Sequence, residues 1–366
     1  MTNQARKRRL SGGVRIAGLL ILVLLGVALT TCGDDPTPNV VDPTGTNTLS
    51  ATATPVSVGP LVATYFYYWY DLPDGPHSTK LADRPAEPEA SYKSVEWFEK
   101  QLLDISDAGI DVALAVYWGA LEPSSDVGLA NMSAAYDLID ARGESPPAIA
   151  MFLDTGAIGQ WPVSQRDLTR LENQERVYTM IRTFYEIVPR HQWMILDDRP
   201  LVWLWAAWFN IKFDRSFFDY VISNFEADFG VRPYIVGEEV WRLAVTSSGV
   251  DKSQQMPLDD FYIWGASLRG FVDPPGGVAQ IGPGFDEREL TGSGRSGRYR
   301  EREDGEFYEQ SFAEAIRSGS RIIAIETWNE FHEASDIADS VEFGRAYIDL
   351  TREWVDRFKA VHAAQP

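Results

Sequence analysis

The sequence predicts a (β/α)₈ barrel, and three observations support this fold class. Eight short runs dense in β-branched and aromatic residues are spread along the chain from Leu61 onward. Most of them are continuous apolar runs rather than alternating ones, as expected for parallel strands covered on both faces. Segments with apolar residues at helical spacing fall between several of these runs. The ~300 residues from Leu61 onward are enough for one large domain.

The predicted elements alternate along the chain. The eight predicted strands are Val62–Trp69, Asp111–Trp118, Ala148–Asp154, Leu201–Trp208, Arg232–Glu238, Phe261–Ala266, Val278–Phe285 and Arg321–Trp328. Helical patterns occupy Val95–Ile105, Val177–Val188, Phe218–Phe229, Tyr308–Ile316 and Phe343–Trp354. Strands that alternate with helices in this way imply a closed parallel barrel with the helices outside.

The pattern is irregular between the fifth and seventh predicted strands. Residues 242–260 hold at most a short helix, and Arg269–Gly277, with two prolines and three glycines, is expected to hold none. The alternative fold is an open doubly wound sheet. No glycine-rich phosphate-binding loop follows the first strand, which argues against that alternative.

The N-terminus has the features of an export signal. Five basic residues precede an apolar run from Ala17 to Ala28, which is too short to span a bilayer as a mature helix. The segment Leu29-Thr30-Thr31-Cys32 resembles the lipobox of bacterial lipoproteins. Cys32 is the only cysteine, so it has no intramolecular disulfide partner, and we expect it to be lipidated. An uncleaved anchor and a plain secretion signal are the alternatives.

These features predict a domain organisation. We expect a lipoprotein signal peptide at 1–31, a lipidated cysteine with a Pro- and Thr-rich tether at 32–58, the barrel at 59–360 and a C-terminal tail at 361–366. The predicted location is extracytoplasmic, with a lipid anchor in the cell membrane. We expect a monomer.

The charge balance argues against nucleic acid as a partner. The chain carries a formal charge of −20, and loss of residues 1–31 would leave 28 basic and 53 acidic residues, a formal charge of −25. A chain this acidic repels phosphate backbones and anionic lipid. The four histidines are scattered without metal-ligand spacing, so we expect no metal and no cofactor.

Aromatic and acidic residues recur where the predicted strands end. In a barrel of this kind, reactive groups lie at the carboxyl ends of the strands and in the following loops. Indole and phenol rings can stack on the CH faces of a sugar, while carboxylates accept hydrogen bonds from its hydroxyls. The alternatives are that the aromatic residues fill the core and that the acids cap the next helix. The predicted substrate-binding residues are Tyr67, Tyr68, Trp69, Trp118, Asp154, Glu238, Trp264, Asp286, Trp328, Asn329 and His332.

Glu330 and Glu333 are the predicted catalytic residues. They stand three positions apart, so they share a face if the chain turns helically there. Two carboxyl groups this close can have different pKa values, because the charge of one raises the pKa of the other. The pair then holds one protonated acid beside one ionised base. Glycosidic bond cleavage needs such a pair. The alternative is a helix N-terminus, whose dipole favours acidic residues for structural reasons.

The segment Thr327–Glu333 resembles the WNEWHEG signature of glycoside hydrolase family 99 and its relatives, including family 71 and family 99-like bacterial lipoproteins. Phe331 stands at the second Trp of the signature, and Ala334 at its Gly. Weaker similarities to the same family lie in Tyr67–Tyr70, Trp97–Trp118, Pro283–Asp286 and Arg300–Tyr308. The resemblance covers roughly Leu61 to Phe358.

The resemblance implies an activity and two roles. Family 99 enzymes are retaining endo-α-mannosidases that need no metal. By resemblance, Glu330 takes the proton of the sugar 2-hydroxyl, whose oxygen closes on the anomeric carbon to form a 1,2-anhydro sugar. Glu333 protonates the departing oxygen and then activates water. We expect a retaining glycoside hydrolase that cleaves an α-linked glycan of the α-mannan or α-glucan type at the cell surface. The alternatives are a non-catalytic carbohydrate-binding lipoprotein and an accessory protein of surface polysaccharide assembly.

Overall fold

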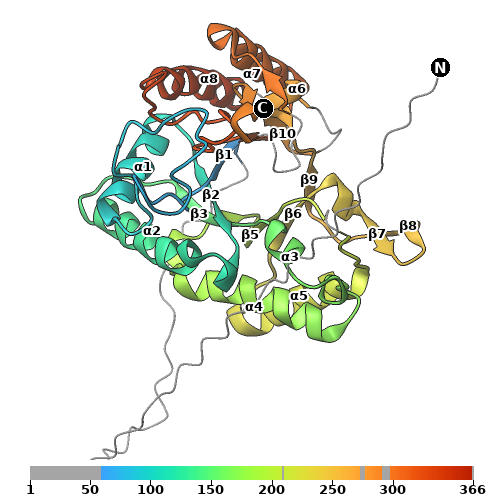
Figure 1. Ribbon diagram of the computed structural model, residues 1–366. Helices are drawn as coiled ribbons and strands as arrows, with labels where there is room; N and C mark the ends of the chain where they lie inside the picture. The colour runs from blue at the N-terminus through green and yellow to red at the C-terminus, as the bar shows by residue number, and fades with distance from the viewer. Residues whose placement is uncertain (1–58, 208–209, 273–276, 291–296, 365–366) are drawn as a thin grey trace, which may run out of the picture. The chain divides into compact units, whose positions relative to one another are not determined.

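The computed structural model describes residues 59–207, 210–272, 277–290 and 297–364. The predicted signal peptide, Cys32 and the tether lie outside the described residues. Eight parallel strands form a barrel with helices around it (Figure 1). The barrel strands are β1 (Leu61–Phe66), β2 (Val112–Tyr117), β3 (Ala148–Leu153), β5 (Arg199–Leu204), β6 (Tyr234–Glu238), β9 (Asp260–Tyr262), β10 (Ala279–Ile281) and β13 (Ile322–Ile325).

All eight predicted strands are confirmed, and the pairing order identifies the fold. Each strand is hydrogen-bonded to the next in the order β10, β13, β1, β2, β3, β5, β6 and β9. The two ends of this order, β9 and β10, meet at a seam where the Val278 N–H donates to the Phe261 carbonyl at 2.8 Å. The barrel is therefore nearly closed, and the open doubly wound alternative is wrong. All the strands except β6 end earlier than predicted, and past most of them aromatic residues continue into the loop.

The helices α1 (Val95–Asp107), α4 (Leu171–Ile187), α5 (Arg215–Phe229), α7 (Glu306–Ser318) and α8 (Ala346–Ala363) match the predicted helical patterns. The last one begins after Phe343 and continues to Ala363, so part of the predicted tail 361–366 is helical. A further helix, α2 (Pro123–Ala141), had no predicted counterpart. Its buried face includes Ser124, Ser125, Gly128 and Ala135, so the apolar periodicity there is weak.

The irregular region between the fifth and seventh strands is confirmed, although its content differs from the prediction. Residues 242–260 contain a hairpin of β7 (Leu243–Thr246) and β8 (Gly249–Gln255) instead of a short helix. The two-residue turn Ser247-Ser248 joins its strands, and Gly249, the first residue of β8, has φ +105°, a value that favours glycine. The hairpin projects from the barrel at the right of Figure 1. Apart from 3₁₀ turns, the remaining short elements are α3 (Gly156–Gly159), α6 (Ala266–Arg269), β4 (Ile195–Leu196), β11 (Phe285–Asp286) and β12 (Tyr299–Arg300).

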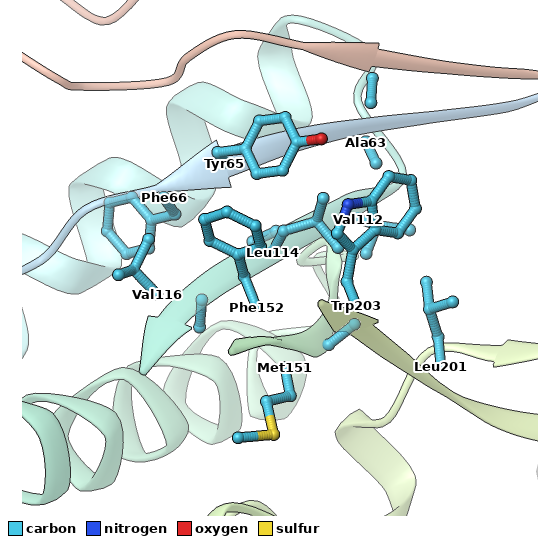
Figure 2. Packing of buried hydrophobic residues seen from close by; sticks show 14 of the residues in the cluster. Ala63, Tyr65, Phe66, Val112, Leu114, Val116, Met151, Phe152, Leu201 and Trp203 are labelled. Carbon is cyan, nitrogen blue, oxygen red and sulfur yellow. The ribbon is translucent and has the colours of Figure 1, made fainter. Parts of the chain in front are cut away.

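Aromatic side chains fill the barrel interior. The ring of Tyr65 lies 4.7 Å from that of Phe152 and 6.1 Å from that of Trp203, and Figure 2 shows these residues converging from β1, β3 and β5. Trp264 lies 4.8 Å from Tyr65 and stacks on Phe152 at an interplanar angle of 16°. Such close packing leaves no channel through the barrel. Within the described ranges, no helix is long and apolar enough to cross a membrane.

Candidate active site

The segment that follows β13 is held in place by the loop that follows β1. The Asn329 side chain accepts from the Tyr67 N–H and donates to the Tyr67 carbonyl, both at 2.7 Å. The hydroxyl of Tyr70 donates to the Asn329 carbonyl at 2.9 Å and accepts from the Phe331 N–H at 3.1 Å. The Phe331 carbonyl accepts from the backbone of Asp83 at 3.1 Å. Because these contacts fix the backbone on both sides of Glu330, its carboxyl group has a defined position.

A cavity of about 670 Å³ opens at the carboxyl ends of the strands. Its volume is in the range of small-ligand sites, about 300–1,000 Å³. We call it the first cavity. The predicted site residues that line it are Tyr67, Trp69, Trp118, Asp154, Trp264, Glu330 and Glu333. Those that do not line it are Tyr68, Glu238, Asp286, Trp328, Asn329 and His332.

Glu330 is buried, and its carboxylate is hydrogen-bonded within its own turn. One oxygen, Oε1, lies 2.8 Å from His332 Nδ1 and accepts from the His332 N–H at 3.1 Å. The Glu330 N–H donates to the Thr327 hydroxyl at 2.9 Å. The imidazole of His332 also stacks on Tyr70 at 5.5 Å, which holds the ring in place. His332, predicted to bind substrate, does not line the first cavity, and its ring orients the Glu330 carboxylate that does.

Glu333 is half-buried and lines the same cavity as Glu330. Its N–H donates to the Glu330 carbonyl at 3.3 Å, so the chain makes a tight turn between the two acids. Its own carbonyl accepts from the Asp286 N–H at 2.6 Å. Tyr67 lies among these acids. Burial raises the pKa of the Tyr67 hydroxyl well above its usual value, and the charges of Glu330, Asp154 and Glu333 raise it further.

Asp154 lines the first cavity beside Trp118. Its carboxylate accepts from the Trp118 indole at 2.7 Å and from the Gly156 N–H at 2.7 Å. Burial raises the pKa of Asp154 to about 6, although these two hydrogen bonds oppose the shift. A Cβ atom on Gly156 would lie 3.0 Å from the Asp154 carboxylate and 3.1 Å from the Trp118 ring. The glycine therefore permits this close arrangement.

Glu326 is a cavity residue that the sequence reasoning missed, because it was assigned to the apolar end of the eighth strand. It is 1% exposed and lines the first cavity. Its carboxylate accepts from the Gly265 N–H at 2.9 Å and from the Ser267 N–H at 3.3 Å. Burial raises the pKa of Glu326 to about 7, against the effect of these hydrogen bonds. An acidic residue inside an apolar strand run was the signal available in the sequence.

Aromatic rings complete the walls. Trp69 stacks on His77 with ring centroids 4.5 Å apart and an interplanar angle of 10°. Trp205 and Trp264, which also line the cavity, meet edge to face at 6.0 Å. Indole faces beside carboxylates suit a ligand with both CH surfaces and hydroxyl groups.

The predicted site residues away from the cavity have structural contacts. Tyr68 and Trp328 are buried. The Tyr68 hydroxyl donates to the Ser125 carbonyl, and the Trp328 indole donates to the side-chain oxygen of Gln101. Glu238 caps the turn after β6 by accepting from the Val240 N–H at 2.9 Å, as the capping alternative expects. Asp286 pairs with Arg288 at 2.6 Å outside the first cavity. Asn329 holds the backbone of Tyr67.

A buried arginine anchors the chain beyond Glu333. Arg302 donates to the Ala334 carbonyl at 3.2 Å and to the Asp336 carbonyl at 2.8 Å. Its guanidinium also binds Asp83 at 2.9 Å and the Asp336 carboxyl at 3.2 Å. Paired buried charges of this kind favour one arrangement over its alternatives, because separating them would leave a charge uncompensated.

The two differences from the family 99 signature have different consequences. Phe331 is 2% exposed and packs against Tyr70, so the loss of an indole there does not alter the cavity lining. Ala334 adopts φ +44°, in the left-handed region that glycine adopts without strain. The second difference therefore affects the backbone directly after Glu333. In the described part of the chain, no group of three or more His, Cys, Asp or Glu residues could hold a metal ion.

The protein is therefore a (β/α)₈ barrel whose acids and aromatic rings gather at the carboxyl ends of the strands, where barrels of this class carry their functional residues. The chain belongs to the family described as "Domain of unknown function (DUF5010)", whose model matches residues 46–364. No curated protein matches the chain.

Solved structures share the fold at low sequence identity. The family 99 endo-α-mannosidase from Bacteroides thetaiotaomicron is similar with a TM-score of 0.60 at 16% identity, over 84% of this chain and 100% of that chain. A protein described as glycoside hydrolase-like has a TM-score of 0.56 at 12% identity, over 81% of this chain and 94% of that one. The fold is therefore one that glycan-processing enzymes use.

Proposed function

We propose that the protein is a retaining glycoside hydrolase that cleaves α-linked glycan of the α-mannan or α-glucan type. The observation that carries the proposal is the joint position of Glu330 and Glu333 on the wall of one cavity. The two acids come from a single tight turn, so both carboxyl groups can reach neighbouring atoms of one bound sugar. Aromatic walls and the neighbouring Asp154 supply the remaining contacts that a pyranose needs.

The turn after β13 suits a reaction through the neighbouring 2-hydroxyl. His332 binds Oε1 of Glu330, which leaves Oε2 to take the proton from the sugar 2-hydroxyl. The freed oxygen attacks the anomeric carbon as the glycosidic bond breaks, and Glu333 gives its proton to the departing oxygen. The product of this step is a 1,2-anhydro sugar. Glu333 then deprotonates a water that opens the ring, and Glu330 returns the proton to O2, so configuration is retained.

The test compares Glu330→Gln and Glu333→Gln with the wild type on a panel of α-mannans and α-glucans. We expect each variant to lose about 100- to 10,000-fold in release of reducing ends, the usual contribution of a general acid or base. Glu239→Gln is the matched control, because Glu239 is an exposed acid after β6 that does not line the cavity. Thermal melting of all variants checks that the fold is intact.

Three outcomes would count against the proposal. Turnover that is undiminished in either variant would remove the assigned roles. Glycan binding without turnover in the wild type would favour the carbohydrate-binding alternative instead. Proton NMR of the first product distinguishes retention from inversion, and an initial β-anomer would exclude the retaining route.

We further propose that the protein is exported and anchored outside the cytoplasm by a lipid on Cys32. The support is the order of basic residues, apolar run and lipobox-like cysteine in the first 32 residues. Metabolic labelling with a fatty acid, followed by membrane fractionation, tests it. We expect Cys32→Ala to abolish labelling and shift the protein from the membrane fraction, and an unlabelled wild type would contradict the proposal.

A further inference from the structure

A second cavity of about 590 Å³ lies beside the first. Phe285 lines both cavities, so this residue forms part of the wall between them. The chain after Glu330 also divides them: Glu333 and Ser335 line the first cavity, whereas Ala334 between them lines the second. The two cavities are therefore neighbours that share one wall.

Two exposed aromatic rings line the second cavity. Tyr299 is 49% exposed and Phe343 is 38% exposed. Within the described ranges, these are the two aromatic side chains among the exposed large hydrophobic residues. Exposed apolar surface that gathers at one place marks a binding site more often than isolated exposure does.

Each ring is supported on one side by an arginine. The guanidinium of Arg288 lies over Tyr299 at 4.1 Å, and that of Arg302 lies over Phe343 at 4.4 Å. Both arginines are in turn fixed by acids, Arg288 by Asp286 and Arg302 by Asp83. The rings are therefore held in position while a large part of their surface stays open, which lowers the entropic cost of stacking a ligand on them.

The charges of the second cavity determine the kind of ligand that it accepts. Its three arginines are paired with acids, because Arg300 binds Glu303 at 3.0 Å in addition to the two pairs above. Glu301, Asp304 and Glu309 also line the cavity and offer further carboxylate oxygens. Carboxylates accept hydrogen bonds from sugar hydroxyls, whereas they repel phosphate, sulfate and uronate groups.

We propose that the second cavity binds further residues of the glycan whose scissile bond lies in the first cavity, and that this glycan is free of anionic groups. The inference rests on the proposed glycosidase function and adds to it a substrate that spans several sugars. Tyr299 and Phe343 act as stacking platforms, and Asp286, predicted to bind substrate, lines the same cavity and holds Arg288 over Tyr299.

The test measures kcat/KM along a ladder of oligosaccharides from the glycan that the wild type cleaves, from the shortest cleavable member to an octasaccharide. We expect the ratio of long-chain to short-chain efficiency to fall about tenfold, or about 1.4 kcal/mol, in the Tyr299→Ala, Phe343→Ala double variant, because both stacking contacts are lost. Leu171→Ala, at a comparably exposed apolar residue on α4, should keep the wild-type ratio. An unchanged ratio in the double variant would overturn the inference.

A binding measurement separates this inference from the proposed function. If the wild type cleaves none of the glycans, calorimetry with neutral α-mannan and α-glucan octasaccharides still tests the platforms. Binding that weakens about tenfold in the double variant would support the second cavity even though the hydrolase proposal fails. Equal binding, or no binding to either protein, would overturn it. Tighter binding of an α-linked oligogalacturonate than of the neutral octasaccharides would overturn the exclusion of anionic glycans.

Discussion

Four carboxyl groups line the first cavity, and their surroundings differ. Glu330 is hydrogen-bonded to His332, and Glu333 is half-buried on the same wall. Burial raises the pKa of Asp154 to about 6 and that of Glu326, which is 1% exposed, to about 7. Groups whose protonation changes near neutral pH are common in active sites, because catalysis needs both forms.

Glu326 makes stability depend on pH in a defined direction. Its pKa is about 7 in the folded chain against a usual value of 4.5, so the folded state holds a proton that the unfolded state has lost. The stability from this group is fully present below about pH 4.5 and is lost as the pH rises through 7. The loss amounts to about 3 kcal/mol of unfolding free energy.

Glu326→Gln should remove this dependence. We expect the free energy of unfolding of the variant, relative to that of the wild type, to be about 3 kcal/mol higher at pH 8 than at pH 4.5. Urea unfolding at the two pH values measures it, and Glu239→Gln at an exposed acid is the control. Parallel pH profiles for Glu326→Gln and the wild type would contradict the assigned burial.

Ala334 allows a test of backbone strain after the second acid. Its φ of +44° costs an alanine about 1–2 kcal/mol, whereas glycine adopts this region freely. We expect Ala334→Gly to leave stability unchanged or raise it by up to about 1 kcal/mol, after the greater entropy of unfolded glycine is included. Ala338→Gly, four residues later and also buried, should destabilise by about 1 kcal/mol instead. Equal destabilisation of both variants, measured by chemical denaturation, would argue against strain at Ala334.

At the scale of elements, the cavity depends on three chain segments that approach closely at one point. The end of β10, the turn that begins α6 and the end of β13 meet at Gly282, Ser267 and Glu326. The Ser267 hydroxyl donates to the Glu326 carbonyl, and the Glu326 carboxylate accepts from the backbone of the same turn. Trp264 stands directly before this turn, so the contact also sets one aromatic wall of the cavity.

Gly282→Ala should disturb this meeting point. The added Cβ would lie 2.1 Å from the Ser267 hydroxyl and 2.6 Å from the Glu326 carbonyl, closer than real contacts allow. We expect a loss of about 1–3 kcal/mol in unfolding free energy together with weaker glycan turnover. Gly143→Ala, at the other end of the barrel beyond α2, has φ +77° and open space around it. It should lower stability without a change in turnover, and equal effects of both variants on turnover would contradict the role of the contact.

At the scale of the whole barrel, neighbouring strands are joined less extensively at the seam between β9 and β10 than on the opposite side. The pairs on the opposite side are longer; β2 and β3, for example, are in register over six residues from Val112 to Tyr117. At the seam, the described backbone contact is the hydrogen bond from Val278 to Phe261. Fewer shared hydrogen bonds lower the free energy of local opening.

Hydrogen exchange should reveal the seam. We expect the amides of β9 and β10 to exchange about tenfold or more faster than those of β2 and β3, measured by mass spectrometry on proteolytic fragments. The strand β13 serves as the internal control, because it is paired on both sides. Protection in β9 and β10 as strong as in β13 would show that the barrel closes as firmly at the seam as elsewhere.

The sequence by itself determined the strand and helix order of most of the barrel. Apolar runs and helical spacing depend on neighbours along the chain, so they can be read without coordinates. The exceptions have local causes: α2 is buried through small residues, and the β7–β8 segment has few apolar residues to show a period. The pairing of Glu330 with Glu333 could also be predicted from the sequence, because a separation of three residues within a turn keeps both side chains together.

Only the tertiary structure decided which side chains at the strand ends face the cavity. Tyr67 and Trp69 line it while Tyr68 and Asn329 do not, because the Tyr68 hydroxyl binds the Ser125 carbonyl in α2 and the Asn329 side chain binds the backbone of Tyr67. Glu326 joins the cavity through the turn at Gly265, 61 residues earlier in the chain. Such placements depend on segments that meet only after the barrel closes, and sequence spacing carries no information about them.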